Sequence, residues 1–75
     1  MNLKRYLVVI EKSSTGYAAY SPDVLGCVSA GDTEEETRAN FQEALECHFK
    51  ARREVGEPIP EPSCIFGYVE VNVAA

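Results

Sequence analysis

The chain has 75 residues and a mass of 8.3 kDa, which leaves room for a single small domain and excludes a large enzyme with a lidded pocket. Hydrophobic residues make up 45% and charged residues 25%, a balance that indicates a folded globular domain. Seven Lys and Arg oppose twelve Asp and Glu, for a formal net charge of −5. This sign argues against binding to nucleic acid or anionic lipid, and it suits either a basic protein partner or solubility alone.

The sequence predicts a cytoplasmic protein that neither spans nor binds a membrane. No apolar run approaches the roughly 20 residues of a bilayer span, and no apolar core follows the basic start at residues 1–5. The three cysteines, at positions 27, 47 and 64, are odd in number and widely spaced, which favours free thiols in a reducing compartment. We expect all three to be small buried side chains.

Apolar runs separated by turn residues predict three strands in the first half of the chain, over residues 3–12, 17–20 and 27–30. Residues 13–16 are a short polar turn between the first two strands. Pro22 ends the second strand because proline donates no ladder hydrogen bond. Val24 and Leu25 are then expected in a loop that leads to Gly26.

A helix is predicted over residues 34–55. Thr33 and Glu36 fit a capping box, and the acidic first turn complements the helix dipole. Gly56 is placed to end the helix, and Pro58 prevents its continuation. One face carries the apolar side chains and the only histidine: Phe41, Ala44, Leu45, His48 and Phe49.

A proline-dense extended connector over residues 58–62 leads to a last predicted strand over residues 64–73. Its two faces alternate, with Ile65, Val69, Val71 and Val73 on one and Cys64, Phe66, Tyr68, Glu70 and Asn72 on the other. The predicted fold class is α+β, a two-layer β-β-β-α-β sandwich. Its mostly antiparallel sheet has the order 3-2-1-4, with the last strand parallel to the first. One helix covers only one sheet face, so we expect a homodimer or higher homo-oligomer, or a foreign partner, on the remaining apolar surface.

The residues give little support for catalysis. His48 lies on the apolar helix face, where a packed role is expected, and the chain has no close cysteine pair and no phosphate-binding loop. We therefore expect no catalytic residues, no metal and no cofactor. One alternative stays open, a metal-dependent nuclease built on the carboxylates Glu11, Asp23, Glu46 and Glu70. The tyrosines Tyr17, Tyr20 and Tyr68 suit a core or a binding surface equally.

Taken in order, several short motifs resemble the HicB-like antitoxin family over residues 6–73. They are residues 16–23 (GYAAYSPD), residues 26–28 (GCV), residues 31–36 (GDTEEE), Asn40, residues 43–45 (EAL), His48 and residues 56–62 (GEPIPEP). Two positions depart from the family pattern. Leu25 stands where the family usually has proline, which puts the loop geometry there in question, and Thr37 stands where it usually has alanine.

The resemblance implies a partial ribonuclease-H-like fold that lacks that fold's catalytic carboxylates. It also implies a non-enzymatic antitoxin of a type II pair, whose partner is a small basic mRNA-cleaving ribonuclease toxin of the HicA type. We expect the toxin contact to include Tyr20, Pro22, Asp23, Gly26, Glu34 and Glu35.

Many family members carry a C-terminal DNA-binding segment, whereas residues 1–75 are expected to form one domain without such a segment and without direct nucleic-acid binding. An orphan homo-oligomeric interaction module without a toxin is the other reading that stays open.

Overall fold

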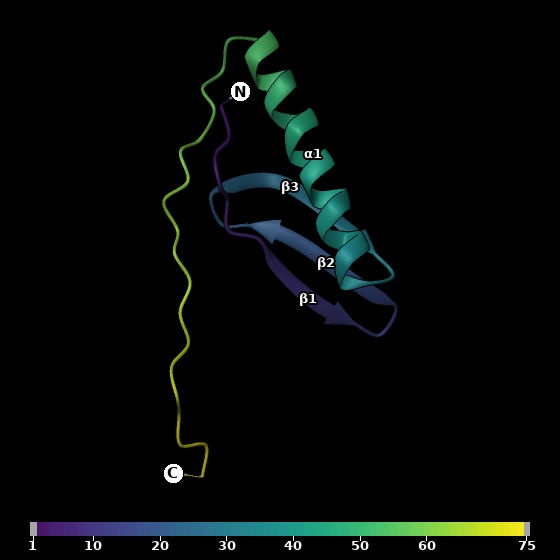
Figure 1. The fold of residues 1–75 in the computed structure, drawn as a ribbon, viewed down its shortest axis with the longest axis vertical. Coiled ribbons are helices and arrows are strands. Elements are labelled where there is room, and N and C mark those ends of the chain that lie inside the picture. Colours follow the sequence, from purple (N-terminus) through teal and green to yellow (C-terminus); the bar gives the residue numbers. More distant parts are fainter. Residues whose placement is uncertain (1, 75) are drawn as a thin grey trace.

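A computed structural model describes residues 2–74 of the protein. Three strands and a helix follow in order: β1 (Val9–Ser13), β2 (Gly16–Ser21), β3 (Val24–Gly31) and α1 (Glu34–Glu54). The strands form one antiparallel sheet with β2 in the centre, and α1 crosses one of its faces (Figure 1). The predicted α+β class, the three-strand meander and the single long helix are therefore confirmed.

The starts of β1 and β3, the two strands on either side of β2, differ from the prediction. β1 begins at Val9 rather than at residue 3, because Val9 pairs with Tyr20 and β2 ends one residue later. The apolar residues before Val9 have no strand to pair with. β3 begins at Val24, which pairs with Ser21 across the tight turn, so the residues expected in a loop belong to the strand.

β3 is irregular where it passes the end of β2. The ladder jumps from the pair Ser21–Val24 to the pair Tyr20–Val28, so residues 25–27 bulge out of register. Gly26 lies in this bulge with a φ of 83°, a left-handed conformation that favours glycine. A Cβ at this position would meet no atom within 4 Å, so the backbone conformation alone selects glycine here.

Replacing Gly26 by alanine is expected to lower the free energy of unfolding by about 1–2 kcal/mol, the cost of a left-handed alanine. Replacement by asparagine should cost less, because its side chain tolerates this region. Urea denaturation followed by circular dichroism measures both variants. Equal stability of the alanine variant and the wild type would show that the bulge does not hold the left-handed conformation in solution.

Both ends of α1 are capped as the sequence predicts. Thr33 Oγ1 accepts a hydrogen bond from the Glu36 N–H at 3.0 Å. At the other end, Gly56 has a φ of 78°, its N–H donates to the Arg53 carbonyl, and the Glu57 N–H donates to the Arg52 carbonyl. This pair of bonds is a Schellman motif, which satisfies the last helical carbonyls. The helix thus ends one residue before the predicted boundary.

The core lies between α1 and the sheet, and its buried hydrophobic residues are Ala19, Val24, Cys27 and Phe41, ringed by half-buried Tyr6, Val8, Ile10, Ala44, Leu45 and Phe49. The start of α1 approaches the end of β3 closely. A Cβ on Gly31 would lie 2.7 Å from Thr37 Oγ1, and Thr37 itself is fully buried, with its hydroxyl donating to the Thr33 carbonyl at 2.7 Å.

The predicted packing of His48 fits its surroundings, but the prediction for the cysteines was wrong at two positions. The ring centroid of His48 lies 6.0 Å from that of Phe49, and its Nε2 accepts a hydrogen bond from Arg52 Nε at 3.2 Å. All three cysteines are free; Cys27 is buried, whereas Cys47 and Cys64 are exposed. Cys47 lies on the solvent side of α1, and Cys64 lies where the chain leaves the body of the molecule.

The predicted fourth strand does not form within the chain, and the sheet order 3-2-1-4 is corrected to a three-stranded β1-β2-β3. Residues 57–72 are extended without strand pairing, and the chain beyond the connector projects away from the sheet (Figure 1). The connector is attached near the start of β1, and the following segment continues in the same direction instead of turning along the β1 edge. No helix in residues 2–74 is long and apolar enough to cross a membrane.

Candidate interaction surfaces

One face of the sheet is left uncovered by α1. Residues directly opposite each other on neighbouring strands share a face, so Val9, Tyr20 and Val28 form one row across all three strands. Their neighbours Ala19 and Ser29 point to the helix side, where Ala19 is buried and the Ser29 hydroxyl donates to the Thr37 carbonyl. The next row on the same face holds Glu11, Ala18 and Ala30, all of them exposed. We call the apolar part of this surface the open face: Val9, Ala18, Tyr20, Val28 and Ala30.

Charges are separated along α1. The segment that enters the helix carries four exposed carboxylates, Asp32, Glu34, Glu35 and Glu36, which we call the acidic end. Glu34 pairs with Arg38 at 3.2 Å on the helix surface. The last turns carry three cations, Lys50, Arg52 and Arg53, and one carboxylate, Glu54. Each sign of charge complements the helix dipole at its own end.

The predicted toxin contacts fall into two groups. Tyr20, Pro22, Asp23 and Gly26 cluster around the turn between β2 and β3, whereas Glu34 and Glu35 follow the opposite end of β3 (Figure 1). The eight residues of β3 span about 26 Å at ~3.3 Å per residue between the turn and the segment that enters α1, and Tyr20, which pairs with Val28, lies between these two ends. The structure therefore does not bring the six residues into one compact site.

Asp23 is engaged by its own chain. Its carboxylate accepts hydrogen bonds from the Ser63 N–H and the Cys64 N–H, both at 3.2 Å, and from the Ser63 hydroxyl at 2.9 Å. Hydrogen bonding from Cys64, foremost through its thiol, and from Ser63 lowers the pKa of Asp23. The hydrogen bond to Asp23 and partial desolvation raise the pKa of the Cys64 thiol. Sequence reasoning assigned Asp23 to a partner, because nothing in the sequence relates it to residues 40 positions away.

Acidification is expected to release this attachment. The folded pKa of Asp23 is depressed, so the stabilisation is fully present above the ordinary value of 3.8 and is lost as the pH falls through the lower folded value. The amide chemical shifts of Ser63 and Cys64, followed by NMR, should therefore titrate with a midpoint below 3.8. The shifts should stay flat in Asp23→Asn. A midpoint at or above 3.8 would contradict the attachment of Ser63 and Cys64 to Asp23.

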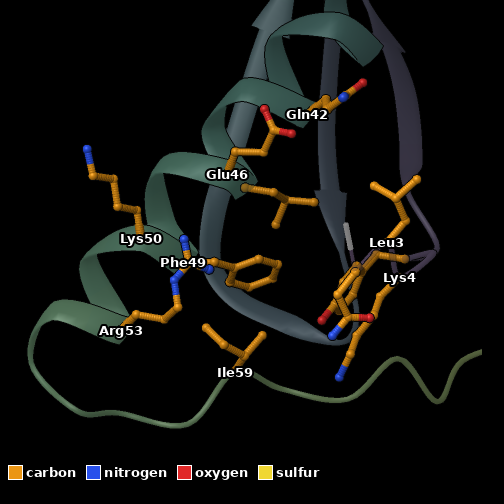
Figure 2. A pocket seen from close by; sticks show the side chains of 11 residues that line it. Leu3, Lys4, Gln42, Glu46, Phe49, Lys50, Arg53 and Ile59 are labelled. Atoms are coloured by element: carbon orange, nitrogen blue, oxygen red, sulfur yellow. The ribbon is translucent and has the colours of Figure 1, made fainter.

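An open cleft of about 750 Å³ separates α1 from residues 2–6. Leu3 and Phe49 point into the cleft, and Lys50 and Arg53 lie at its rim (Figure 2). Tyr6 lines it as well. Tyr6 and Phe49 pack with ring centroids 5.2 Å apart, and the Tyr6 hydroxyl donates to the Pro60 carbonyl at 2.6 Å. Sequence reasoning missed this cleft because it placed residues 3–8 in a paired strand, although their apolar pattern did mark them for packing.

The four carboxylates of the alternative nuclease hypothesis do not lie together in one site. Glu11 lies on β1, Glu46 lies on α1, Asp23 binds Ser63 and Cys64, and Glu70 lies in the projecting segment. Among residues 2–74, no three His, Cys, Asp or Glu side chains are arranged to hold a metal ion. The surfaces that the fold does offer are apolar and charged faces suited to protein contact.

Residues 6–72 match the model of the HicB-like antitoxins of bacterial toxin–antitoxin systems. The chain belongs to this family. The match covers every strand, the helix and most of the projecting segment, so the resemblance seen in the sequence motifs is confirmed over nearly the whole chain.

Curated relatives of this HicB-like chain agree with the family. It is 40% identical over 75 residues to "Antitoxin HicB 2" of Photorhabdus laumondii, covering 95% of this chain and 53% of the relative. It is 41% identical over 64 residues to an uncharacterized 14.9 kDa protein of Haemophilus phage HP1, covering 85% of this chain and 48% of that protein. This chain thus spans about half the length of these two relatives.

Two solved structures resemble the HicB-like fold described above. A chain of a HicA3–HicB3 toxin–antitoxin complex superposes with a TM-score of 0.69 and 35% identity, covering 80% of this chain and 70% of that chain. The crystal structure of antitoxin HicB3 gives a TM-score of 0.66 at 37% identity, covering 76% and 42% of the respective chains. The three-stranded sheet and helix are thus shared with antitoxins of known structure.

Proposed function

We propose that this chain is a non-enzymatic, cytoplasmic antitoxin that binds a small basic mRNA-cleaving ribonuclease toxin of the HicA type and inhibits it by covering its active surface. The likeness to a chain of the HicA3–HicB3 complex supports this assignment. The proposal includes the partial ribonuclease-H-like fold that the family resemblance implies.

The observation that carries the proposal is the apolar open face beside a cluster of carboxylates. Val28 is 72% exposed and Tyr20 is 40% exposed, although the two residues pair within the sheet. A shallow hollow lies at the end of this face, lined by small residues such as Ala18 and Ala30 and by Asp32 of the acidic end. An apolar patch bounded by charge is typical of a protein-binding surface.

The two parts of this surface have different roles in the proposed complex. The acidic end attracts and orients a basic toxin, because complementary charge raises the rate of encounter. The open face supplies the contact from which water is excluded and from which most of the affinity comes. Pro22 and Gly26, at the far end of the open face, border the same contact in this proposal, whereas Asp23 acts mainly within the chain.

An affinity pull-down of the tagged chain from its native host, read by intact mass, tests the proposal. We expect a stoichiometric small basic partner, whose cleavage of mRNA stops when the purified chain is added. Recovery of copies of this chain alone would contradict the antitoxin assignment and favour the orphan interaction module.

Charge reversal at the acidic end gives a narrower test. Glu34→Lys with Glu35→Lys should weaken binding of the recovered toxin roughly tenfold, mostly through slower association, and the wild-type association rate should fall as salt is added. The control is Glu43→Lys with Glu54→Lys, which changes the net charge equally at exposed helix positions beyond the first turn. Equal losses of toxin binding in the two double variants would show that the acidic end is not part of the contact.

DNA binding by these 75 residues is not part of the proposal, because a net charge of −5 opposes the phosphate contacts that it would need. A gel shift with the chain's own promoter at physiological salt should show no complex. A specific shift would overturn this expectation.

A further inference from the structure

The projecting segment, residues 65–73, exposes apolar side chains on both of its faces. Phe66 and Tyr68 pack edge to face with centroids 6.3 Å apart, but Tyr68 remains 93% exposed and Ile65 92% exposed. Val69, Val71 and Val73 are exposed as well. We call this segment the tail. Such a concentration of exposed apolar residues on an extended backbone is the composition of a strand that lacks its partner.

The connector fixes the point from which the tail departs. The Lys4 ammonium pairs with the Glu61 carboxylate, and the Tyr6 hydroxyl binds the Pro60 carbonyl. Asp23 then holds Ser63 and Cys64. Prolines at positions 58, 60 and 62 keep the intervening backbone extended and stiff. The tail therefore leaves the body at residue 65 in a set direction, away from its own sheet (Figure 1).

A strand edge is available to receive a tail. Within residues 2–74, β1 pairs with β2 alone, so its outer edge presents unpaired backbone donors and acceptors. Side chains along β1 alternate between the helix side, where Ile10 is half buried, and the open face, where Val9 lies. The tail alternates with the same period of two. Its valines match one side of the sheet, and its two aromatic rings match the other.

We propose that two copies of this chain exchange tails, each tail adding as a fourth strand to the free edge of β1 in the other copy. The exchange is reciprocal, because the same segment and the same edge meet twice about a two-fold axis, and the assembly closes as a dimer. It restores the sheet that the sequence pattern predicts, with the last strand beside the first, but supplies that strand from a second copy.

The charge of the tail favours a second copy over the toxin as its occupant. Between residues 64 and 74 the only charged side chain is Glu70, so the tail offers little to a basic protein. The carboxylates that suit such a protein lie at the acidic end instead. An almost uncharged tail also lets two copies, each with a net charge of −5, meet with few like charges in the contact, where Glu70 of the tail joins Glu11 and Lys12 of β1.

The mass of the complete chain in solution is the first test and needs no toxin, so its outcome is separate from that of the antitoxin proposal. Light scattering after size exclusion should give twice the 8.3 kDa of one chain. Val69→Pro, which removes a ladder donor in the middle of the tail, should weaken dimerisation at least tenfold. Ala74→Pro introduces the same residue beyond the tail and should leave the dimer intact.

Cross-linking distinguishes exchange from a tail that folds back on its own β1. Two chains are mixed, one carrying Val71→Cys and the other Glu11→Cys, both with Cys47→Ser and Cys64→Ser, and a short bis-maleimide is added. Exchange predicts cross-links that join the two different chains. A monomer, or a dimer insensitive to Val69→Pro, would overturn the proposal. So would cross-links between the tail and β1 that form only within single chains when one chain carries both Val71→Cys and Glu11→Cys.

Discussion

Replacing Phe41 by alanine should remove a large part of the stability of this protein. Phe41 is 3% exposed and stands at the centre of the core, between α1 and the sheet. Loss of a buried phenyl ring costs about 3–5 kcal/mol, because the transfer free energy is lost and a cavity remains. A domain of 75 residues has a total stability of about 4–11 kcal/mol at ~0.05–0.15 kcal/mol per residue. The variant should therefore lose roughly half of its free energy of unfolding, which urea titration by circular dichroism measures.

The tail offers a matched control for this prediction. Phe66→Ala makes the same chemical change at a side chain that is 75% exposed. At concentrations where the chain is monomeric, its urea midpoint should stay within the ±0.5 kcal/mol usual for surface substitutions. Comparable destabilisation by the two variants would show that the tail packs on the body of its own chain.

The largest expected effect on toxin binding comes from Val28→Lys. This side chain belongs to the row that Val9, Tyr20 and Val28 form across the open face, where it lies directly opposite Tyr20. A lysine there would be desolvated against apolar surface and would also repel a basic toxin. We expect affinity to fall at least about 30-fold, which corresponds to roughly 2 kcal/mol, the threshold of an interface hot spot. Isothermal titration of the recovered toxin measures the loss.

Val55→Lys is the control for the charge that this substitution adds. Val55 is 69% exposed at the end of α1, close to the 72% of Val28, so the two variants share residue type, exposure and net charge. Neither should unfold the protein. Only the variant on the open face should lose toxin affinity, and equal losses would move the contact away from this face.

Features encoded by neighbouring residues were predictable from the sequence. The capping Thr33 and the terminating Gly56 bracket α1 to within one residue, because both act through hydrogen bonds to residues close in sequence. The three strands follow from apolar runs between turns. The ends of the strands do not follow from these runs, since β1 starts opposite the last residues of β2 and the bulge in β3 arises where β2 ends.

The candidate surfaces were predictable only in part, for the same physical reason. A single helix cannot cover both faces of a sheet, so an exposed apolar surface was expected, although Tyr20 suited a core as well as a binding surface. The hydrogen bonds from Ser63 to Asp23 join segments 40 residues apart, and no local sequence pattern predicts such a contact. The tail has the composition of a strand, but composition does not determine which sheet edge it pairs with, or whether that edge belongs to the same chain or to another copy.

The uneven distribution of charge along α1 gives the helix an electric dipole. The first turn carries three carboxylates, whereas the last turns carry three cations and one carboxylate, Glu54, so the net charge changes sign along a helix of 21 residues, about 32 Å at ~1.5 Å per residue. In the field of a positively charged toxin such a body experiences a torque as well as an attraction, and it turns its carboxylate end forward before contact. Collisions that begin in random orientation are thus converted into productive ones, and added salt should reduce this alignment within a Debye length of about 8 Å at physiological ionic strength.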